Sequence, residues 1–391
     1  MQFADFIAPV DPATFHAEYY GRRPLHIRRG RAAGPDIFNW KRFNDILAIS
    51  SYWNEDTLTL YFNNRAALRE SYCDTSAAVG RKAPVSSDKV KALIGLGASV
   101  VANHVNNVSS HLRAATWMLE QEFAARSFAN IYCSFQGVQA FQTHFDLHDV
   151  FAFQAEGEKT WRIYEARAEA PVQPVPPGDE GEKWLVQTRG NLLFEAHMKP
   201  GDVLYLPRGQ YHDALTGAAA SLHVTFGVSP PTGIALFKLL EDALAHEKDF
   251  REYLPNSRDE EKLRQHLRRL AKRINEIAMS QSFLTDVRDH QRKLAKGPPA
   301  DYRLPTQTKT DWFAVVKRAS VVRREAGYVV VFEGGECALS SGRATTEWLL
   351  QQARFSFADL NTIDSAKDQR TLHADLEKLI QAGIVVKIDM Q

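Results

Sequence analysis

The chain has only three cysteines, and they lie far apart in its 391 residues: Cys73, Cys133 and Cys337. So few thiols at such spacing provide no disulfide framework and are typical of a reducing compartment. Residues 1–13 include Asp5 and Asp11 and contain no long apolar run, which is unlike a secretory signal. We therefore predict a cytoplasmic protein.

Long apolar runs and an excess of either charge are also missing. No stretch approaches the roughly 18 apolar residues of a membrane-spanning helix, so we expect no membrane partner. The 48 basic and 47 acidic residues give no overall attraction to nucleic acid or an anionic membrane. An apolar content of 44% is that of a globular protein, and the length predicts two or three domains.

Short strands dominate the first 230 residues. They are predicted over residues 130–135, 150–154, 160–164, 203–206 and 221–228. In the last strand, apolar residues alternate with smaller or polar ones: Leu222, Val224, Phe226 and Val228 against Ser221, His223, Thr225 and Gly227. Strands at this spacing with Gly and Pro turns indicate a sandwich or barrel, and the Pro-rich residues 170–181 predict an exposed inserted loop.

The apolar period becomes helical after residue 233. A stripe on one helix face is predicted from Leu263, Leu267, Leu270, Ile274 and Ile277. Residues 297–299, Gly-Pro-Pro, then predict a linker. Residues 301–391 have the pattern of a small α/β module, with strands over 328–332 and 384–388 and helices over 345–354 and 371–382.

The tripeptide His144-Phe145-Asp146 contains two metal-ligating side chains two residues apart. In a strand, residues i and i+2 project to the same face, so both side chains can reach one ion. His212 is the candidate third ligand, because a Gly-Asp turn, a short strand and a Pro-Gly bend lead the chain toward a barrel mouth. Two histidines and one carboxylate form the facial triad that leaves iron positions open.

Each part of this pattern has a structural alternative. An isolated His-x-Asp is usually a hydrogen-bonded surface pair, and His212 alone would be a turn histidine. The combination, in strand context and in this order, favours metal binding.

The segments around these residues resemble the JmjC/cupin-4 oxygenases, and among them the ribosomal oxygenases, which hydroxylate ribosomal proteins. The similarity is found in residues 20–27, 144–146, 149–151, 154–161 and 201–212. It implies a mixed α+β chain with a double-stranded β-helix (cupin or jelly-roll) JmjC core. We expect this catalytic domain over residues 1–230, a helical dimerisation region over 231–299 and a winged-helix-like domain over 300–391.

The resemblance also implies Fe(II) as the metal, with 2-oxoglutarate and O₂ as cosubstrates. Lys159 lies where the family carries a Lys or Arg for the C5 carboxylate of 2-oxoglutarate; a solvent-facing lysine is the alternative. Asn130 and Tyr132 share one strand face and would bind the cosubstrate or line its pocket. As a bare pattern, Tyr132 fits a core aromatic with a satisfied hydroxyl equally well.

Three further residues near the motif have open roles. We interpret His148 as pocket wall, because a fourth protein ligand would block the coordination that an oxygenase needs. His223 fits either a place behind the metal ligands or a satisfied core histidine. Gly227 stands where the ribosomal oxygenases carry a serine, which limits the transfer of their cosubstrate contacts.

The regions that follow residue 230 indicate which kind of macromolecule the chain contacts. A helix predicted over residues 258–296 carries 11 basic and 6 acidic residues, which fits a nucleic-acid face or a solvated amphipathic helix. Its apolar stripe must be buried, and the resemblance implies a C2 homodimer. Residues 301–391 contain 12 basic and 12 acidic residues, so we expect protein contacts there and no direct DNA binding.

We therefore expect an Fe(II)- and 2-oxoglutarate-dependent dioxygenase that hydroxylates a protein side chain. By resemblance the target is an Arg or His of a ribosomal protein. The alternatives are an oxygenase acting on a peptide, a small molecule or RNA, and a catalytically silent cupin scaffold. The intact set of His144, Asp146, His212 and Lys159 argues against the silent scaffold.

Overall fold

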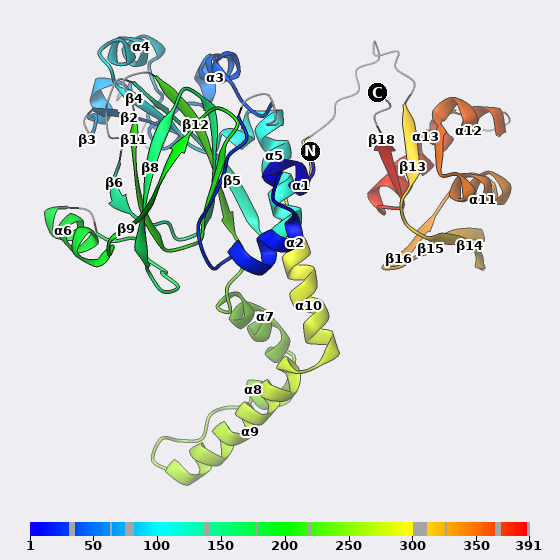
Figure 1. Ribbon diagram of the computed structural model, residues 1–391. Helices are drawn as coiled ribbons and strands as arrows, with labels where there is room; N and C mark the ends of the chain where they lie inside the picture. The colour runs from blue at the N-terminus through cyan, green and yellow to red at the C-terminus, as the bar shows by residue number, and fades with distance from the viewer. Residues whose placement is uncertain are drawn as a thin grey trace. The chain divides into compact units, whose positions relative to one another are not determined.

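The computed structural model describes residues 1–30, 36–62, 65–74, 82–135, 141–176, 178–216, 220–299, 311–324, 327–363 and 369–388. The chain divides into two compact units, Met1–Ala300 and Asp301–Gln391 (Figure 1). The first unit contains both the strand-rich region and the helices that follow it.

Two antiparallel sheets form the strand-rich region. The larger sheet has the order β1 (Leu25–Ile27), β10 (Val203–Leu206), β7 (Asp149–Glu156), β12 (Ser221–Ser229), β5 (Arg126–Ser134), β4 (Ser99–Ala102), β2 (Leu58–Phe62) and β3 (Arg65–Ala66). The smaller sheet has the order β6 (Phe141–His144), β11 (Gln210–Thr216), β8 (Lys159–Arg167) and β9 (Leu192–Met198). Buried side chains of both sheets form one cluster, which includes Val150, Trp161, Ile163 and Leu204. The predicted sandwich or barrel of short strands is confirmed, and it consists of these two sheets.

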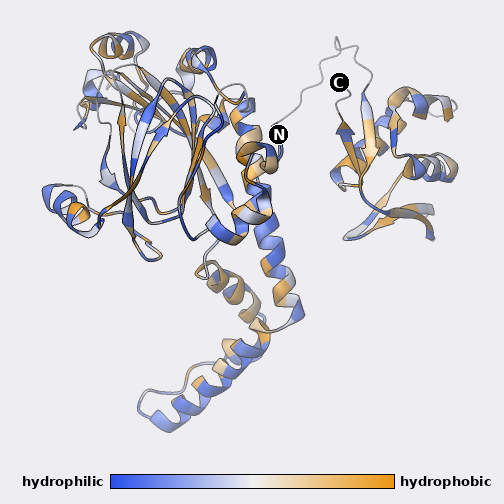
Figure 2. Cartoon of the chain, in the orientation of Figure 1, coloured by the Kyte–Doolittle hydropathy of each residue, from blue (hydrophilic) through white to orange (hydrophobic). Residues whose placement is uncertain are grey.

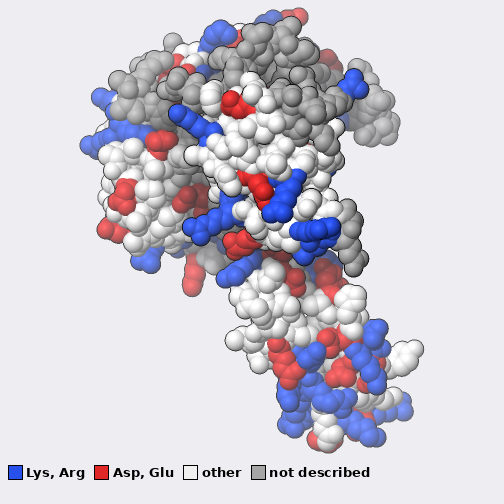
Figure 3. Space-filling view, turned by 90° about the vertical axis from the view of Figure 1, so that its right-hand side faces the viewer, with Lys and Arg blue, Asp and Glu red and all other residues white. Residues whose placement is uncertain are grey.

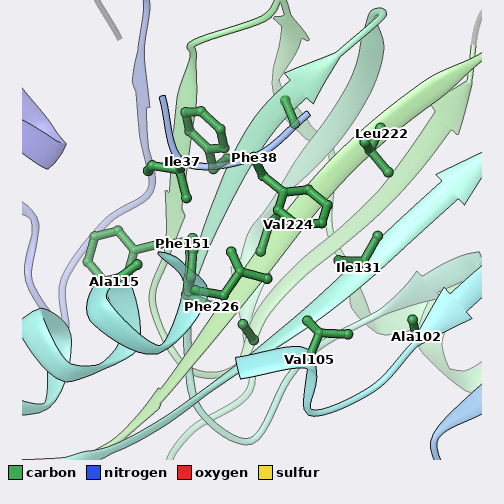
Figure 4. Packing of buried hydrophobic residues seen from close by; sticks show 14 of the residues in the cluster. Ile37, Phe38, Ala102, Val105, Ala115, Ile131, Phe151, Leu222, Val224 and Phe226 are labelled. Atoms are coloured by element: carbon green, nitrogen blue, oxygen red, sulfur yellow. The ribbon is translucent and has the colours of Figure 1, made fainter. Parts of the chain in front are cut away.

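The alternation predicted for residues 221–228 divides the two faces of β12. Leu222, Val224 and Phe226 enter the main core, where Figure 4 shows them beside Ile131 and Phe151. His223 and Thr225, on the other face, line a cavity between the sheets. One strand thus supplies both the core and the wall of a candidate site.

Short helices of the first unit cover the outer face of the larger sheet. They are α1 (Phe3–Ile7), α2 (Pro12–Thr14), η1 (Phe15–Tyr19), α3 (Trp40–Leu47), η2 (Ser50–Tyr52), η3 (Arg69–Ser71), α4 (Ser87–Gly95), η4 (Val105–Asn107) and α5 (Ser110–Phe123). Aromatic rings pack these helices against the sheet. The centroid of the Phe3 ring lies 5.3 Å from that of Phe123 and 6.1 Å from that of Phe151, and both contacts are edge to face. This core holds the larger sheet rigid behind the cavity.

The Pro-rich insertion is only partly the predicted loop. Its last residues begin α6 (Asp179–Thr188), so the prediction of a loop through residue 181 was wrong at that end. Acidic residues occupy the first turn of this helix, where they interact favourably with the helix dipole: Asp179, Glu180 and Glu182.

Four helices follow the strands: α7 (Ala235–Leu244), α8 (Lys248–Arg251), α9 (Glu260–Ala278) and α10 (Gln281–Arg292). The single helix predicted over residues 258–296 was wrong, because the chain turns at Ser280, whose side chain caps α10 by accepting from the Phe283 amide. In Figure 1, α10 returns toward α5, and the Lys296 amide donates to the buried Glu120 carboxylate at 3.0 Å. None of the described helices is long and apolar enough to cross a membrane.

The described residues of the second unit form two three-stranded sheets and three helices. The sheets have the orders β17 (Arg354–Ser356), β13 (Trp312–Val315), β18 (Val385–Ile388) and β14 (Ala319–Arg324), β15 (Gly327–Phe332), β16 (Gly335–Ala338). The helices are α11 (Arg343–Gln351), α12 (Phe357–Ile363) and α13 (Gln369–Gln381). The helix predicted over 345–354 thus ends early, because residues 354–356 pair with β13 instead.

Candidate metal centre

His144, Asp146 and His212 lie together at one end of the cavity. His144 is the last residue of β6 and is directly opposite His212 on β11 in the strand register. Asp146 follows β6 by two residues, so it lies just beyond the strand rather than within it as predicted. One ligand atom from each residue lies within 4.8 Å of the others.

The bend before His212 is fastened to the backbone of Asp146. The Gly209 amide donates a hydrogen bond of 2.9 Å to the Asp146 carbonyl. Gly209 has φ +84°, and a Cβ there would lie 2.2 Å from the Ala168 carbonyl oxygen. Only glycine satisfies both the backbone conformation and this close approach, so the sequence brings the third ligand back to the first two.

Both histidines are oriented by their Nδ1 atoms. The distance from Nδ1 to a backbone carbonyl is 2.8 Å for His144 and 2.9 Å for His212, with Gln142 and Gln210 as the acceptors. A carbonyl only accepts, so each Nδ1 carries the proton and donates. Each Nε2 then carries a lone pair instead of a proton, which is the arrangement of metal-ligating histidines. The Nε2 of His212 lies 3.6 Å from an Asp146 carboxylate oxygen.

The electrostatics suit a cation. Burial, reinforced by the nearby His144, lowers the pKa of His212 to about 4, so its imidazole is neutral at pH 7. Burial opposes ionisation of Asp146, but the proximity of His144, His212 and His148 outweighs burial and lowers the pKa of the carboxyl. Two imidazoles and one carboxylate are a donor set that binds first-row divalent metals.

A cavity of about 150 Å³ opens from these three side chains. It is lined by Phe128, Asn130, Tyr132, His144, Asp146, His148, Val150, Lys159, Trp161, His212, Ala214, His223 and Thr225. The structure therefore brings every residue of the predicted site to one place. Two buried polar atoms of this wall, Trp161 Nε1 and His223 Nδ1, have no hydrogen-bond partner among the described residues. Such atoms fit a cavity that receives a polar ligand.

Lys159 is a buried cation in this wall. The residue is 3% exposed, and among the described residues its ammonium has no hydrogen-bond or ion-pair partner. Burial lowers its pKa to about 8. An unpaired buried ammonium is costly, so the site favours an anion that would pair with it.

Asn130 and Tyr132 have contacts of their own. The Asn130 side-chain oxygen accepts from the His104 amide at 3.0 Å. Tyr132 stacks on His223 with ring centroids 4.9 Å apart and planes 4° apart. Burial, followed by the Asp146 charge, raises the pKa of Tyr132, so its hydroxyl stays protonated and can donate.

Sequence reasoning missed the buried carboxylate next to His212. Asp213 accepts from Arg162 Nε at 2.7 Å, from the Tyr164 hydroxyl at 2.7 Å and from the Thr143 hydroxyl at 2.9 Å. Arg189 donates to the same Thr143 and Tyr164 hydroxyls. These bonds join β6, β8 and β11 directly behind the ligands. The only sequence signal was an acidic residue facing away from His212 in a strand of a buried sheet.

Residues 101–236 match the JmjC domain family. Among curated relatives, the chain is 27% identical over 266 residues to "Bifunctional lysine-specific demethylase and histidyl-hydroxylase NO66" of Dictyostelium discoideum, covering 64% of this chain and 48% of the relative. It is 28% identical over 264 residues to "Ribosomal oxygenase 1" of Danio rerio, covering 65% of this chain and 46% of the relative. The chain thus spans about half the length of these relatives.

A solved structure extends the likeness beyond the JmjC domain. The ribosomal oxygenase YcfD of Escherichia coli, in complex with cobalt and 2-oxoglutarate, aligns with a TM-score of 0.51 over 97% of this chain and 99% of its own. The sequence identity is 15%, so the match concerns the fold. Together with the JmjC match it confirms the predicted cupin-type core and the resemblance drawn from the sequence.

Proposed function

We propose that the chain is an Fe(II)- and 2-oxoglutarate-dependent dioxygenase that hydroxylates a side chain of a protein. The observation that carries this proposal is the cluster of His144, Asp146 and His212 opening onto a cavity with a buried lysine that has no ion-pair partner in the described part of the chain. Three protein ligands leave positions for a bidentate cosubstrate and O₂. Bound there, Fe(II), 2-oxoglutarate and O₂ supply the oxidation that places a hydroxyl on an unactivated carbon.

The cavity residues divide the remaining tasks. Lys159 would pair with the C5 carboxylate of 2-oxoglutarate, and the keto and C1 carboxylate oxygens would bind the metal that His144, Asp146 and His212 hold. Tyr132 and Asn130 would supply polar contacts along its length. Trp161 and His223 line the cavity and would help to exclude water from it once the cosubstrate is bound.

The target we propose is a side chain that enters from a folded protein or an exposed loop, by resemblance an Arg or His of a ribosomal protein. A cavity of about 150 Å³ is small beside the roughly 300–1,000 Å³ of pockets that enclose a drug-sized ligand, which favours a target that inserts a single side chain. The names of the relatives, which include ribosomal oxygenases and histidyl-hydroxylases, support this class.

We propose a domain division of 1–230 for catalysis, 231–299 for dimerisation and 300–391 as a winged-helix-like contact module. The helices of the middle region present large apolar side chains to solvent, among them Phe237 at 71% and Leu267 at 51% exposure. A second copy of the chain would cover them. Lys and Arg are mixed with Asp and Glu over this region in Figure 3, which supports a protein contact more than a nucleic-acid one. The three free cysteines suit the cytoplasm.

Coupled turnover tests the proposal. The purified chain with Fe(II), ascorbate and 2-oxoglutarate should release succinate slowly, and ribosomal subunits should accelerate the release and gain the mass of one oxygen atom on one protein. A His212→Ala variant should do neither. Acceleration by oligonucleotides or a metabolite extract alone would refute a protein substrate. Absence of any succinate would refute the oxygenase and leave a scaffold.

A further inference from the structure

Gly227 lies in the middle of β12, on the face that lines the cavity. A Cβ at this position would lie 2.3 Å from Phe128 Cζ and 2.4 Å from His148 Cδ2, closer than side chains approach one another. The backbone is ordinary strand, so conformational strain does not require glycine here. The space is instead occupied by two aromatic rings.

These rings form a stacked pair over the glycine. Phe128 and His148 have ring centroids 5.0 Å apart and planes 20° apart. Phe128 is fixed from β5 as the direct register partner of Gly227, and it also contacts the His104 ring edge to face at 5.7 Å. His148 comes from the segment between Asp146 and β7, and it lines the cavity beside the metal ligands.

His148 is therefore a third imidazole close to the metal centre. It does not belong to the group of ligand atoms within 4.8 Å of one another, which among the described residues contains only His144, Asp146 and His212. If it joined them, it would take a position that 2-oxoglutarate or O₂ needs. Some feature of this chain must hold it aside.

We propose that Gly227 is a positioning residue that keeps His148 stacked on Phe128 and off the metal. This inference rests on the proposed metal centre. A side chain at position 227 would occupy the space that the His148 imidazole fills. The Phe128 ring lies on one side of the imidazole and β12 lies beneath it. A displaced His148 would therefore move into the cavity that contains the ligands.

Cobalt(II) alone is the probe for this idea, because its visible absorption reports the number and type of its ligands. The wild-type chain should bind Co(II), and His212→Ala should abolish the binding. In Gly227→Ala, the Co(II) spectrum should change and 2-oxoglutarate should bind the Co(II) form about tenfold or more weakly. The double variant Gly227→Ala, His148→Ala should regain the wild-type spectrum and affinity, because the extra ligand is gone.

Two results would overturn the proposal while leaving the metal centre intact. One is a Gly227→Ala spectrum identical to that of the wild type; the other is a changed spectrum that persists in the double variant. Failure of wild-type Co(II) binding would instead refute the proposed function. If Gly227→Ala does not fold, Phe128→Ala removes the stacking partner without adding atoms. It should change the spectrum in the same direction by a smaller amount, and no change would refute the proposal.

Discussion

Each histidine of the metal centre is oriented by a carbonyl two residues before it in its own strand. Gln142 accepts from His144 and Gln210 accepts from His212, so the backbone selects the tautomer that leaves Nε2 available. The motif in the sequence predicted which residues meet. It did not predict these bonds, because a backbone acceptor carries no residue-specific signal.

Lys159 allows a sharp test at the residue scale. We expect Lys159→Ala to raise the KM for 2-oxoglutarate on the order of a hundredfold, because truncating one partner of a buried charge pair costs about 2–4 kcal/mol. Metal affinity should hardly change. Lys183→Ala, which removes an exposed lysine of α6, is the matched control. Unaltered 2-oxoglutarate kinetics would eliminate the role, and Arg162 could not replace it, since Asp213 already binds its guanidinium at 2.7 Å.

The lowered pKa of the same residue predicts a pH dependence. Lys159 is charged below its pKa of about 8 and neutral above it, so the affinity for 2-oxoglutarate should be greatest below about pH 8 and fall as the pH rises. Lys159→Arg should bind with little change over this range, because arginine stays charged. Calorimetric titration at a series of pH values would measure this. An affinity of the wild-type chain that does not decline toward about pH 9.5 would contradict the assignment.

At the scale of elements, the strands that carry the ligands are joined by the Asp213 carboxylate. Asp213→Ala would leave Arg162, Tyr164 and the Thr143 hydroxyl without their shared acceptor. We expect the free energy of unfolding to fall by about 2–3 kcal/mol, less than for a fully buried pair because the Arg162 side chain is 31% exposed. Metal affinity should fall as well, since β6 and β11 lose their alignment.

Denaturant unfolding and Co(II) titration would measure the two effects. Asp179→Asn, in the exposed first turn of α6, is the control for a lost carboxylate: it should lower the free energy of unfolding by less than about 1 kcal/mol, the interaction with the helix dipole, and leave metal affinity unchanged. An Asp213→Ala chain with wild-type stability would show that the bonds behind the ligands are replaced by water. Wild-type metal affinity with reduced stability would limit Asp213 to a role in folding.

The helices and strands also show how much of the fold could be predicted from the sequence. Strands β5, β7, β8, β10 and β12 were predicted within a few residues, because alternation and turn residues are local signals. The break between α9 and α10 was missed. Ser280 is a good capping residue, but the apolar stripe ends before it and so carries no signal for a second helix. The role of Gly227 could not be predicted, because it depends on two rings from distant segments.

At the scale of the whole molecule, the helical region of residues 231–299 predicts that the chain forms a homodimer. Figure 2 shows α9 as mostly hydrophilic with hydrophobic patches along it, and its stripe residues are only partly covered within one chain. Leu267→Glu with Ile274→Glu should give monomers or unfolded protein, because two charges would enter an apolar contact. Gln265→Glu with Asn275→Glu, on exposed positions of the same helix, should stay dimeric. Light scattering that gives one chain of 44.1 kDa for the wild type at micromolar concentration would contradict the dimer.

The central claim is that His144, Asp146 and His212 bind one divalent metal ion. The most direct test is a crystal structure of the chain with Mn(II), which replaces Fe(II) without turnover, and 2-oxoglutarate. We predict Mn(II) within roughly 2.0–2.3 Å of His144 Nε2, an Asp146 carboxylate oxygen and His212 Nε2. 2-Oxoglutarate should complete the coordination, with its C5 carboxylate against Lys159. A metal bound elsewhere, or a His212 ring turned away from His144, would contradict the account.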